Sequence, residues 1–469
     1  MKDTLSQQLR KLKRHTHQPF HILKSIARDA AWVATVAEEL AFPLISNLRC
    51  GRWYVDPNLA HDSCYFKSTD GHYGKWDVPT RRLNLHMLAV LEQHQGIIIV
   101  DSTRKGKRFP DALSRTVPLW CAAMNAFLFP DRSVLSDAQL VHLPLCTLPS
   151  LVSASEASSM QAVLDHQVLP RLRSVQLRAL PAVAKPLRCI WISPDMAVQR
   201  VDPSELDFTP IYCVTASRVI NDASIIREEG FVYVQGGADD EENWALGLTP
   251  ELFWSNTDAL LASATSCDAF LDALRTNQDR PIDLGVNSES GSHVARLPGT
   301  PLFVGSRGAA RPSELPWSTY THGINCTDLE HLPLDEYLAP LRQELAPTEQ
   351  LSSRYLCLQV PEGKKGAAAL EASFSVAIQW AEREIVPLGD SARVFVHCDQ
   401  GRDRSVCVAL ALILSLWPHA LDNHAPATPL TKDAIRNALL WMTSHYPRAL
   451  PSRASLKRLN CHFLDAPSG

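Results

Sequence analysis

The chain has 469 residues, 45% of them hydrophobic and 20% charged, with a formal net charge of −4. This length suits roughly two to four domains of ordinary size, and no apolar run approaches the roughly 20 residues of a membrane span, so the sequence does not predict a membrane protein. The small negative charge does not by itself predict a nucleic-acid partner.

The first 20 residues, MKDTLSQQLRKLKRHTHQPF, are basic and polar and lack the apolar segment of a signal peptide. The protein is therefore expected in the cytoplasm, where its twelve cysteines stay reduced. No CxxC pair indicates a zinc site. Basic residues gather in three clusters, which favour a polyanionic partner. The clusters are Lys2, Arg10, Lys11, Lys13, Arg14, Lys24 and Arg28; Arg104, Lys105, Lys107 and Arg108; and Arg448, Arg453, Lys457 and Arg458.

Helical and strand-like segments alternate up to a predicted boundary segment, and this alternation predicts a mixed α/β domain at 1–290. The predicted helices are 20–40 and 81–94, and the predicted strands are 96–101, 188–193, 210–216 and 230–236. The boundary segment, GVNSESGSHVARLPGTP at 285–301, is rich in Gly, Ser and Pro and has no apolar periodicity.

Two loops in this first domain are more polar than a core requires. The first is CYFKSTDGHYGKW at 64–76, in which Lys67, Ser68, Thr69, Asp70 and His72 surround a turn at Gly71. Hydroxyls, a lysine, an acid and a histidine at one turn could bind phosphate, orient a metal or supply a general base. A purely local turn in which Ser, Thr or Asp caps the backbone is the alternative.

The second polar loop follows the predicted buried strand at 96–101. It contains Asp101, Ser102, Thr103, Arg104, Lys105, Gly106 and Lys107. Open α/β sheets bind ligands where a parallel strand runs into such a loop. The G-x-x-x-x-G-K-S/T spacing of a Walker loop is absent.

The second predicted domain, 298–469, also alternates strands with helices and should contain a largely parallel sheet. The predicted strands are 301–305, 321–325, 354–360 and 393–397, and the predicted helices are 368–385 and 406–416. Between the last strand and the last helix lies the loop VHCDQGRDRS, 396–405, with the spacing H-C-x-x-G-x-x-R-S.

This loop predicts a phosphate site. Its backbone N–H groups can form an anion-binding nest at a helix N-terminus, while Arg404 offers a bidentate contact for phosphate oxygens. The same positive field favours a nucleophilic thiolate at Cys398. The residues predicted to bind phosphate are Cys398, Asp399, Gln400, Gly401, Arg402, Asp403, Arg404 and Ser405.

The loop resembles that of cysteine-dependent phosphatases, and LPGTPLFVGSRGAA, THGINCT and FSVAIQWAERE also resemble segments of a dual-specificity phosphatase. Those enzymes supply a general-acid aspartate upstream of the loop. Here that place has Pro361 and Glu362. Asp399 and Asp403 would also oppose a dianion unless a cation neutralises them. We therefore expect this loop to hold a phosphate without requiring Cys398 to attack it.

Blocks along nearly the whole chain resemble the initiator tRNA phosphoribosyl transferases of fungi and plants. The blocks are SNLRCGRWYVDP, YFKSTDGH, IIIVDSTRKGKRFPDALSRTVPLW, VTASR, YVQGGADDEENWALGLTPELFW and YPRALPSRASLKRLNCHFL. The resemblance implies an enzyme, a pentosyltransferase acting in translation initiation. It would move a 5-phosphoribosyl group from phosphoribosyl pyrophosphate to the 2′-hydroxyl of adenosine 64 in initiator methionine tRNA. A dual-specificity-phosphatase-like domain at the C-terminus is also implied.

The implied reaction needs cations on the departing pyrophosphate and a base near the attacking hydroxyl. We predict Asp70 or His72 as the base and Asp101 as a contact to the ribose or to Mg²⁺, the ion expected with the donor. The first domain's predicted phosphate ligands are Lys67, Ser68, Thr69, Ser102, Thr103, Arg104 and Lys107. The predicted tRNA contacts are Lys11, Lys13, Arg14, Arg448, Arg453, Lys457 and Arg458.

Nothing in the sequence indicates a tightly bound organic cofactor or an obligate protein partner. Two other functions stay open. One is a cysteine-dependent phosphatase of protein or RNA phosphates, and the other is a tRNA-binding protein without catalytic activity.

Overall fold

A computed structural model describes residues 19–69, 74–104, 106–174, 180–220, 227–228, 230–245, 247–276, 294–306, 320–328, 354–424, 430–446 and 448–464. The chain divides into two compact units, one from the ranges 1–78 and 87–290 and the other from 79–86 and 291–469. Each unit contains a five-stranded sheet, so the predicted α/β class is confirmed. No helix in the described part of the chain has both the length and the apolar character of a membrane span.

The sheet of the first unit is parallel throughout, with strand order β2-β1-β3-β5-β4. Its strands are β1 (Leu44–Asn47), β2 (Ala60–Cys64), β3 (Ile97–Asp101), β4 (Leu187–Ile192) and β5 (Thr209–Thr215). Every residue of β3 and β5 is buried, because a parallel sheet has both faces covered. The strand order reverses between β1 and β3, and open α/β sheets bind ligands at such a switch point.

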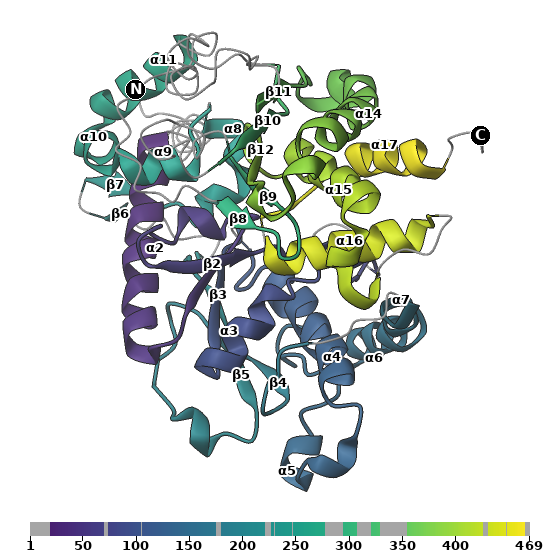
Figure 1. The fold of residues 1–469 in the computed structure, drawn as a ribbon. Coiled ribbons are helices and arrows are strands. Elements are labelled where there is room, and N and C mark those ends of the chain that lie inside the picture. The colour runs from purple at the N-terminus through teal and green to yellow at the C-terminus, as the bar shows by residue number, and fades with distance from the viewer. Residues whose placement is uncertain are drawn as a thin grey trace. The chain divides into compact units, whose positions relative to one another are not determined.

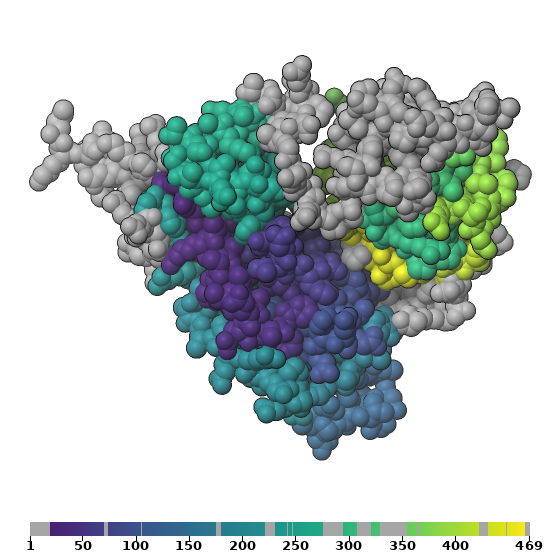
Figure 2. Space-filling view, turned by 60° about the vertical axis from the view of Figure 1, so that its left-hand side comes forward, coloured from purple at the N-terminus to yellow at the C-terminus, as the bar shows by residue number. Residues whose placement is uncertain are grey.

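Helices cover both faces of this sheet (Figure 1). The residues Ile98 and Val100 of β3 pack in one core with α2, and Ile97 and Ile99 point to the opposite face because side chains alternate along a strand. α10 and α11 pack against α2 and form a continuous surface with it (Figure 2). The helices are α2 (Pro19–Leu40), α3 (His86–His94), α4 (Val117–Leu128), α5 (Asp137–Leu140), α6 (Ala154–Val163), α7 (Leu169–Ser174), α8 (Glu241–Trp244), α9 (Pro250–Ser255), α10 (Thr257–Ala262) and α11 (Ala264–Thr276).

The strand predicted at 230–236 is wrong for most of its length. Only β7 (Phe231–Val232) is a strand, and it pairs with β6 (Arg227–Glu228) in a separate antiparallel hairpin. Gly230 and Gly236 have positive φ angles and turn the chain at both ends. Between them, the backbone N–H of Val234 donates to the Oγ of Ser25 on α2, so this segment binds a helix instead of the sheet.

The sheet of the second unit has the order β11-β10-β12-β9-β8, with β8 antiparallel at one edge. Its strands are β8 (Val294–Arg296), β9 (Leu302–Ser306), β10 (His322–Asn325), β11 (Tyr355–Cys357) and β12 (Val394–Cys398). β8 lies within the segment predicted as a linker, where its pairing with β9 extends the sheet.

Four described helices gather beside this sheet (Figure 1). They are α14 (Ala367–Glu384), α15 (Arg404–Leu416), α16 (Lys432–His445) and α17 (Arg453–Leu464). α15 is apolar around its circumference and is buried from Arg404 to Leu414, as expected for a helix in the middle of a core. It packs on β12 and β9, and the turn that connects it to β12 is the predicted phosphate loop.

Candidate functional site

Asp101 lies at the switch point of the first sheet, at the end of β3. Its side chain is fully buried and accepts four hydrogen bonds. Oδ2 accepts from the Nδ2 of Asn47 at 2.8 Å and from the Nε of Arg49 at 3.1 Å. Oδ1 accepts from the backbone N–H of Ser102 at 2.9 Å and from the Sγ of Cys50 at 2.8 Å. The carboxylate therefore links the end of β1 and the residues just after it to the loop after β3.

Arg49 is the cation closest to this carboxylate. Its guanidinium also contacts the carboxylate of Asp239 and the backbone carbonyl of Ser102. Burial opposes its charge, but the neighbouring Cys50, Asp101 and Asp239 outweigh burial and raise the pKa of Arg49. A permanently charged guanidinium between two carboxylates gives the buried charges partners, which such charges need.

The two polar loops found in the sequence lie side by side. Asn47 bridges them, because its amide exchanges two hydrogen bonds with the backbone of Phe66 while it also binds Asp101. Asp111 makes a second bridge, accepting from the Oγ1 of Thr69 and from the Nζ of Lys107, both at 3.2 Å. Asp111 immediately precedes a π-helical turn (Ala112–Thr116), a local widening often found at functional sites.

The predicted phosphate ligands in this unit differ in exposure. Lys67 is exposed, and the side chains of Arg104 and Lys107 are 66% and 45% exposed. Arg104 reaches Asp240 at 3.3 Å. Thr69, Ser102 and Thr103 are buried, and the hydroxyl of Ser102 donates to that of Ser217 at 2.7 Å. Three cationic side chains thus remain accessible to an anion.

Asp70 and His72, the predicted bases, lie outside the described residues. The described residues contain no group of three or more His, Cys, Asp or Glu side chains arranged to hold a metal ion. The predicted contact between Asp101 and Mg²⁺ therefore stays a prediction. The observed contacts of Asp101 are those of a residue that positions its loop.

The second candidate site is the loop between β12 and α15. Cys398 is 2% exposed, and the hydroxyl of Ser405 donates to its Sγ at 3.2 Å. Gly401 has a φ angle of +69°, and a Cβ there would lie 2.6 Å from both the carbonyl carbon of Gly305 and the hydroxyl of Tyr446. Only glycine therefore fits at this turn.

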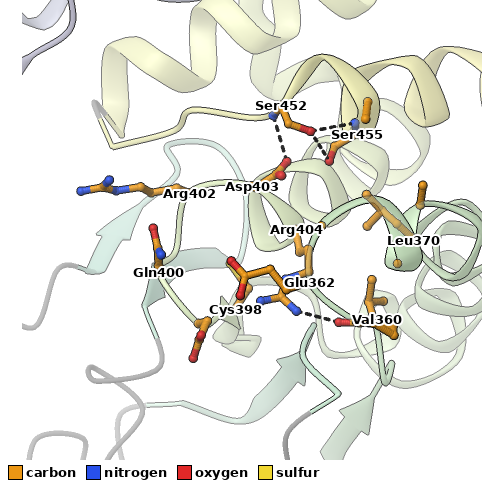
Figure 3. Close-up of a pocket in the computed structure, with 16 residues that line it drawn as sticks. Val360, Glu362, Leu370, Cys398, Gln400, Arg402, Asp403, Arg404, Ser452 and Ser455 are labelled. Carbon is orange, nitrogen blue, oxygen red and sulfur yellow. Dashed lines mark hydrogen bonds between the residues drawn. The ribbon is translucent and has the colours of Figure 1, made fainter. Parts of the chain in front are cut away.

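A pocket of about 370 Å³ opens over this loop (Figure 3). Cys398, Arg404 and Glu362 all line it, so the residue that stands in place of the usual general acid does face the same space as the cysteine. The other lining residues are Val360, Pro361, Gly363, Gly366, Ala367, Leu370, Asp399, Gln400, Arg402, Asp403, Ser452, Ala454 and Ser455.

The charged residues of the loop have separate partners. The Nη1 of Arg404 donates to the carbonyl of Val360 at 2.7 Å, which orients the guanidinium beside the pocket (Figure 3). Asp403 accepts from the backbone N–H of Ser452 at 3.0 Å, so its charge is directed toward the start of α17. Arg402 is largely buried, and burial lowers its pKa. The opposition to a dianion predicted for Asp403 stays a prediction.

The predicted tRNA contacts fall into two groups. Arg453 and Lys457 are exposed one turn apart on α17, whose first residues line the pocket. Arg458 forms an ion pair with Glu371 at 2.9 Å, and Arg448 is half-buried. Lys11, Lys13 and Arg14 lie outside the described residues.

Sequence reasoning missed Asn47, Arg49 and Asp111. Asn47 ends β1 and Arg49 follows it, and the four residues of this strand are too few to show a clear strand pattern. Asp111 lies in the segment 97–120, but it comes after the basic cluster from Arg104 to Arg108, from which the phosphate ligands were predicted. The available signal for Asn47 was its place as a polar residue at the end of a short apolar run, where parallel strands of an open sheet present ligand-binding residues.

Asp29, a buried acid of the first unit, predicts that the stability of the fold depends on pH. Burial raises the pKa of Asp29 to about 8, and its carboxyl accepts from the hydroxyl of Tyr233 at 2.8 Å. The folded protein therefore keeps a proton that the unfolded chain releases above roughly pH 4. The stability that this proton supplies is complete below about pH 4 and is lost as the pH rises toward 8.

Asp29→Asn should remove this dependence. Between about pH 4 and pH 8 the variant should gain stability relative to the wild type by at most about 1.4 kcal/mol per pH unit, measured by urea unfolding at several pH values. A difference between the two proteins that stays constant over this range would show that Asp29 does not titrate there.

Comparison with known proteins identifies relatives of the whole chain. The family model described as the Rit1 N-terminal domain matches residues 12–275, and the one described as the Rit1 DUSP-like domain matches 354–463. An uncharacterised protein of Schizosaccharomyces pombe is 34% identical, covering 98% of this chain and 96% of its own. The tRNA A64-2′-O-ribosylphosphate transferase of Saccharomyces cerevisiae is 38% identical over 49% of this chain and 48% of its own.

Solved phosphatase structures match a little over a third of the chain. The phosphatase domain of Yvh1 from Chaetomium thermophilum is 20% identical, with 38% of this chain and 99% of that one covered and a TM-score of 0.29. Human DUSP28 is 21% identical, with 36% and 92% covered and a TM-score of 0.24. The two Rit1 matches and the relative aligned over nearly the full length of both chains lead to one conclusion: the chain belongs to the Rit1 family.

Proposed function

We propose that the protein transfers a 5-phosphoribosyl group from phosphoribosyl pyrophosphate to the 2′-hydroxyl of adenosine 64 in initiator methionine tRNA. The observation that carries this proposal is the membership of the Rit1 family, in which the relative from Saccharomyces cerevisiae is a tRNA A64-2′-O-ribosylphosphate transferase. The modification would act in translation initiation, in the cytoplasm. All twelve cysteines are free thiols, which agrees with a reducing compartment.

The cations near the switch point of the first unit support this proposal. Pyrophosphate leaves the anomeric carbon with its negative charge increasing, and cations that meet this charge lower the barrier. Lys67, Arg104 and Lys107 are among the exposed cations in the described residues of the two adjoining loops. We assign them to the phosphates of the donor, with Asp70 or His72 taking the proton of the attacking hydroxyl.

Mg²⁺ is expected to arrive with the donor's pyrophosphate. The described residues hold no cluster of metal ligands, and Asp239 and Asp240 are already paired with Arg49 and Arg104.

In this proposal the second unit binds phosphate and tRNA. The pocket over Cys398 offers backbone amides and Arg404 to a phosphate, and Arg453 and Lys457 stand exposed beside it. Helical RNA is recognised through phosphates and 2′-hydroxyls across its shallow groove, and dispersed cations suit such a substrate.

A phosphatase is the second candidate function. It is favoured by the hydroxyl of Ser405 on the Sγ of Cys398 and by Glu362 in the same pocket. Turnover of p-nitrophenyl phosphate that disappears in Cys398→Ser would support it.

Transfer of label is the direct test of the proposed function. The full chain should move radioactivity from ribose-labelled phosphoribosyl pyrophosphate to initiator methionine tRNA and release one pyrophosphate for each label transferred. Elongator methionine tRNA and initiator tRNA with a 2′-O-methyl group at adenosine 64 serve as controls and should stay unlabelled. No transfer to unmodified initiator tRNA, with both substrates intact, would reject the proposal.

A further inference from the structure

Gln235 binds backbone carbonyl groups of the loop after β3, at 102–107, which is called the basic loop below. The side chain of Gln235 is 4% exposed. Its Nε2 donates toward the carbonyl oxygens of Thr103 at 3.4 Å, Arg104 at 3.3 Å and Lys107 at 2.8 Å. Its Oε1 accepts from the backbone N–H of Ile220 at 2.8 Å, which fixes the orientation of the amide.

Gly236 lets the turn approach the loop. Its φ angle is +62°, and a Cβ at this position would lie 2.1 Å from the carbonyl oxygen of Thr103. Its backbone N–H donates at 3.1 Å to the hydroxyl of Ser217, which in turn accepts from Ser102. The loop and the turn are therefore in direct backbone contact, and no larger residue fits between them.

In the basic loop, these contacts bind carbonyl oxygens and leave cationic side chains exposed. Carbonyl oxygens carry partial negative charge and repel an anion, whereas amides and cationic side chains attract it. Gln235 binds three of the carbonyls, and Arg49 binds that of Ser102. The side chains of Arg104 and Lys107 are left 66% and 45% exposed.

We propose that Gln235 is a positioning residue for the donor. By binding the carbonyls of Thr103, Arg104 and Lys107, it keeps this loop in the shape in which its cations and amides receive the pyrophosphate of phosphoribosyl pyrophosphate. This inference rests on the proposed function for the identity of the donor.

Two substitutions test the role of the amide. Gln235→Met keeps the size of the side chain and removes the donor, and Gln235→Glu places a carboxylate against three carbonyls. In steady-state transfer by the full chain, each substitution should raise the KM for phosphoribosyl pyrophosphate by about tenfold or more, because each removes a hydrogen bond to this loop. The effect of Gln235→Glu should be the larger of the two. The kcat and the affinity for tRNA should change by less than about threefold.

Gln139→Glu is the matched control. Gln139 is partly exposed in the first unit and accepts from the backbone N–H of Ser136 through Oε1, an acceptor that glutamate retains. Its kinetic constants should equal those of the wild type. Folded Gln235 variants with an unchanged KM for the donor, while the wild type transfers label, would overturn the inference and leave the proposed function standing.

Hydrogen exchange on the wild-type protein adds a test that needs no variant. Inorganic pyrophosphate should slow exchange in peptides covering residues 101–108 and in those covering 233–237. Absence of protection in both segments, at pyrophosphate concentrations that inhibit transfer, would also overturn the inference about Gln235. A wild-type chain that never transfers label but shows this protection would reject the proposed reaction and keep the anion-binding loop.

Discussion

Asp101→Asn is expected to lower the free energy of unfolding by about 3 kcal/mol and transfer activity by at least about a hundredfold. The substitution removes a buried negative charge beside Arg49, and breaking a buried pair leaves the remaining charge without full compensation. It also turns an amide donor toward the donors of Asn47 and Arg49. Urea unfolding followed by tryptophan fluorescence and transfer of label measure the two effects.

Asp77→Asn is the control for this experiment. Asp77 lies in the same unit and pairs with Arg171, but its side chain is 47% exposed, and pairs at the surface contribute about 1 kcal/mol or less. A folded Asp101→Asn protein with wild-type stability and full transfer would contradict both the structural and the catalytic importance of this carboxylate. Reduced transfer at normal stability would instead favour the direct contact to ribose predicted from the sequence.

Arg404→Ala is expected to lower transfer by about a hundredfold, whereas Cys398→Ser should change it by less than about threefold. The guanidinium is the cation that the structure orients beside the pocket, and charge-assisted contacts to phosphate are among the stronger hydrogen bonds. The proposed function assigns binding to the guanidinium and not to the thiol, and serine keeps a polar group at the position of the cysteine. Transfer of label and the affinity for initiator tRNA should be measured for both variants.

Arg404→Lys separates charge from geometry. It keeps the positive charge but loses the planar fork, so it should restore only part of the activity. The opposite pattern, in which Cys398→Ser loses transfer and Arg404→Ala keeps it, would assign the cysteine to catalysis. Thermal unfolding of each variant controls for the lost contact to Val360.

The strongest predictions from sequence were those that depend on local pattern. The apolar run of β3, the helical spacing of α2 and the long apolar run of α15 each identify an element without reference to the rest of the chain. The phosphate loop was recognisable for the same reason, since its cysteine and arginine are separated by a single turn between a strand and a helix. The strand predicted at 230–236 failed because its backbone donors bind side chains of α2, which the local pattern does not contain.

Local sequence pattern is enough to predict the α/β class, the two polar loops and the cysteine loop, and the resemblance to a known family indicates the reaction. The contacts of Asn47 with Asp101, of Arg49 with Asp239 and of Gln235 with the loop after β3 become visible in the folded chain, where they join residues 54, 190 and up to 132 positions apart. Element type follows from the periodicity of neighbouring residues, whereas these partners follow from how distant elements pack, and for Asn47 and Asp101 from strand order. The order β2-β1-β3-β5-β4 brings the ends of β1 and β3 together, and no local pattern specifies that order.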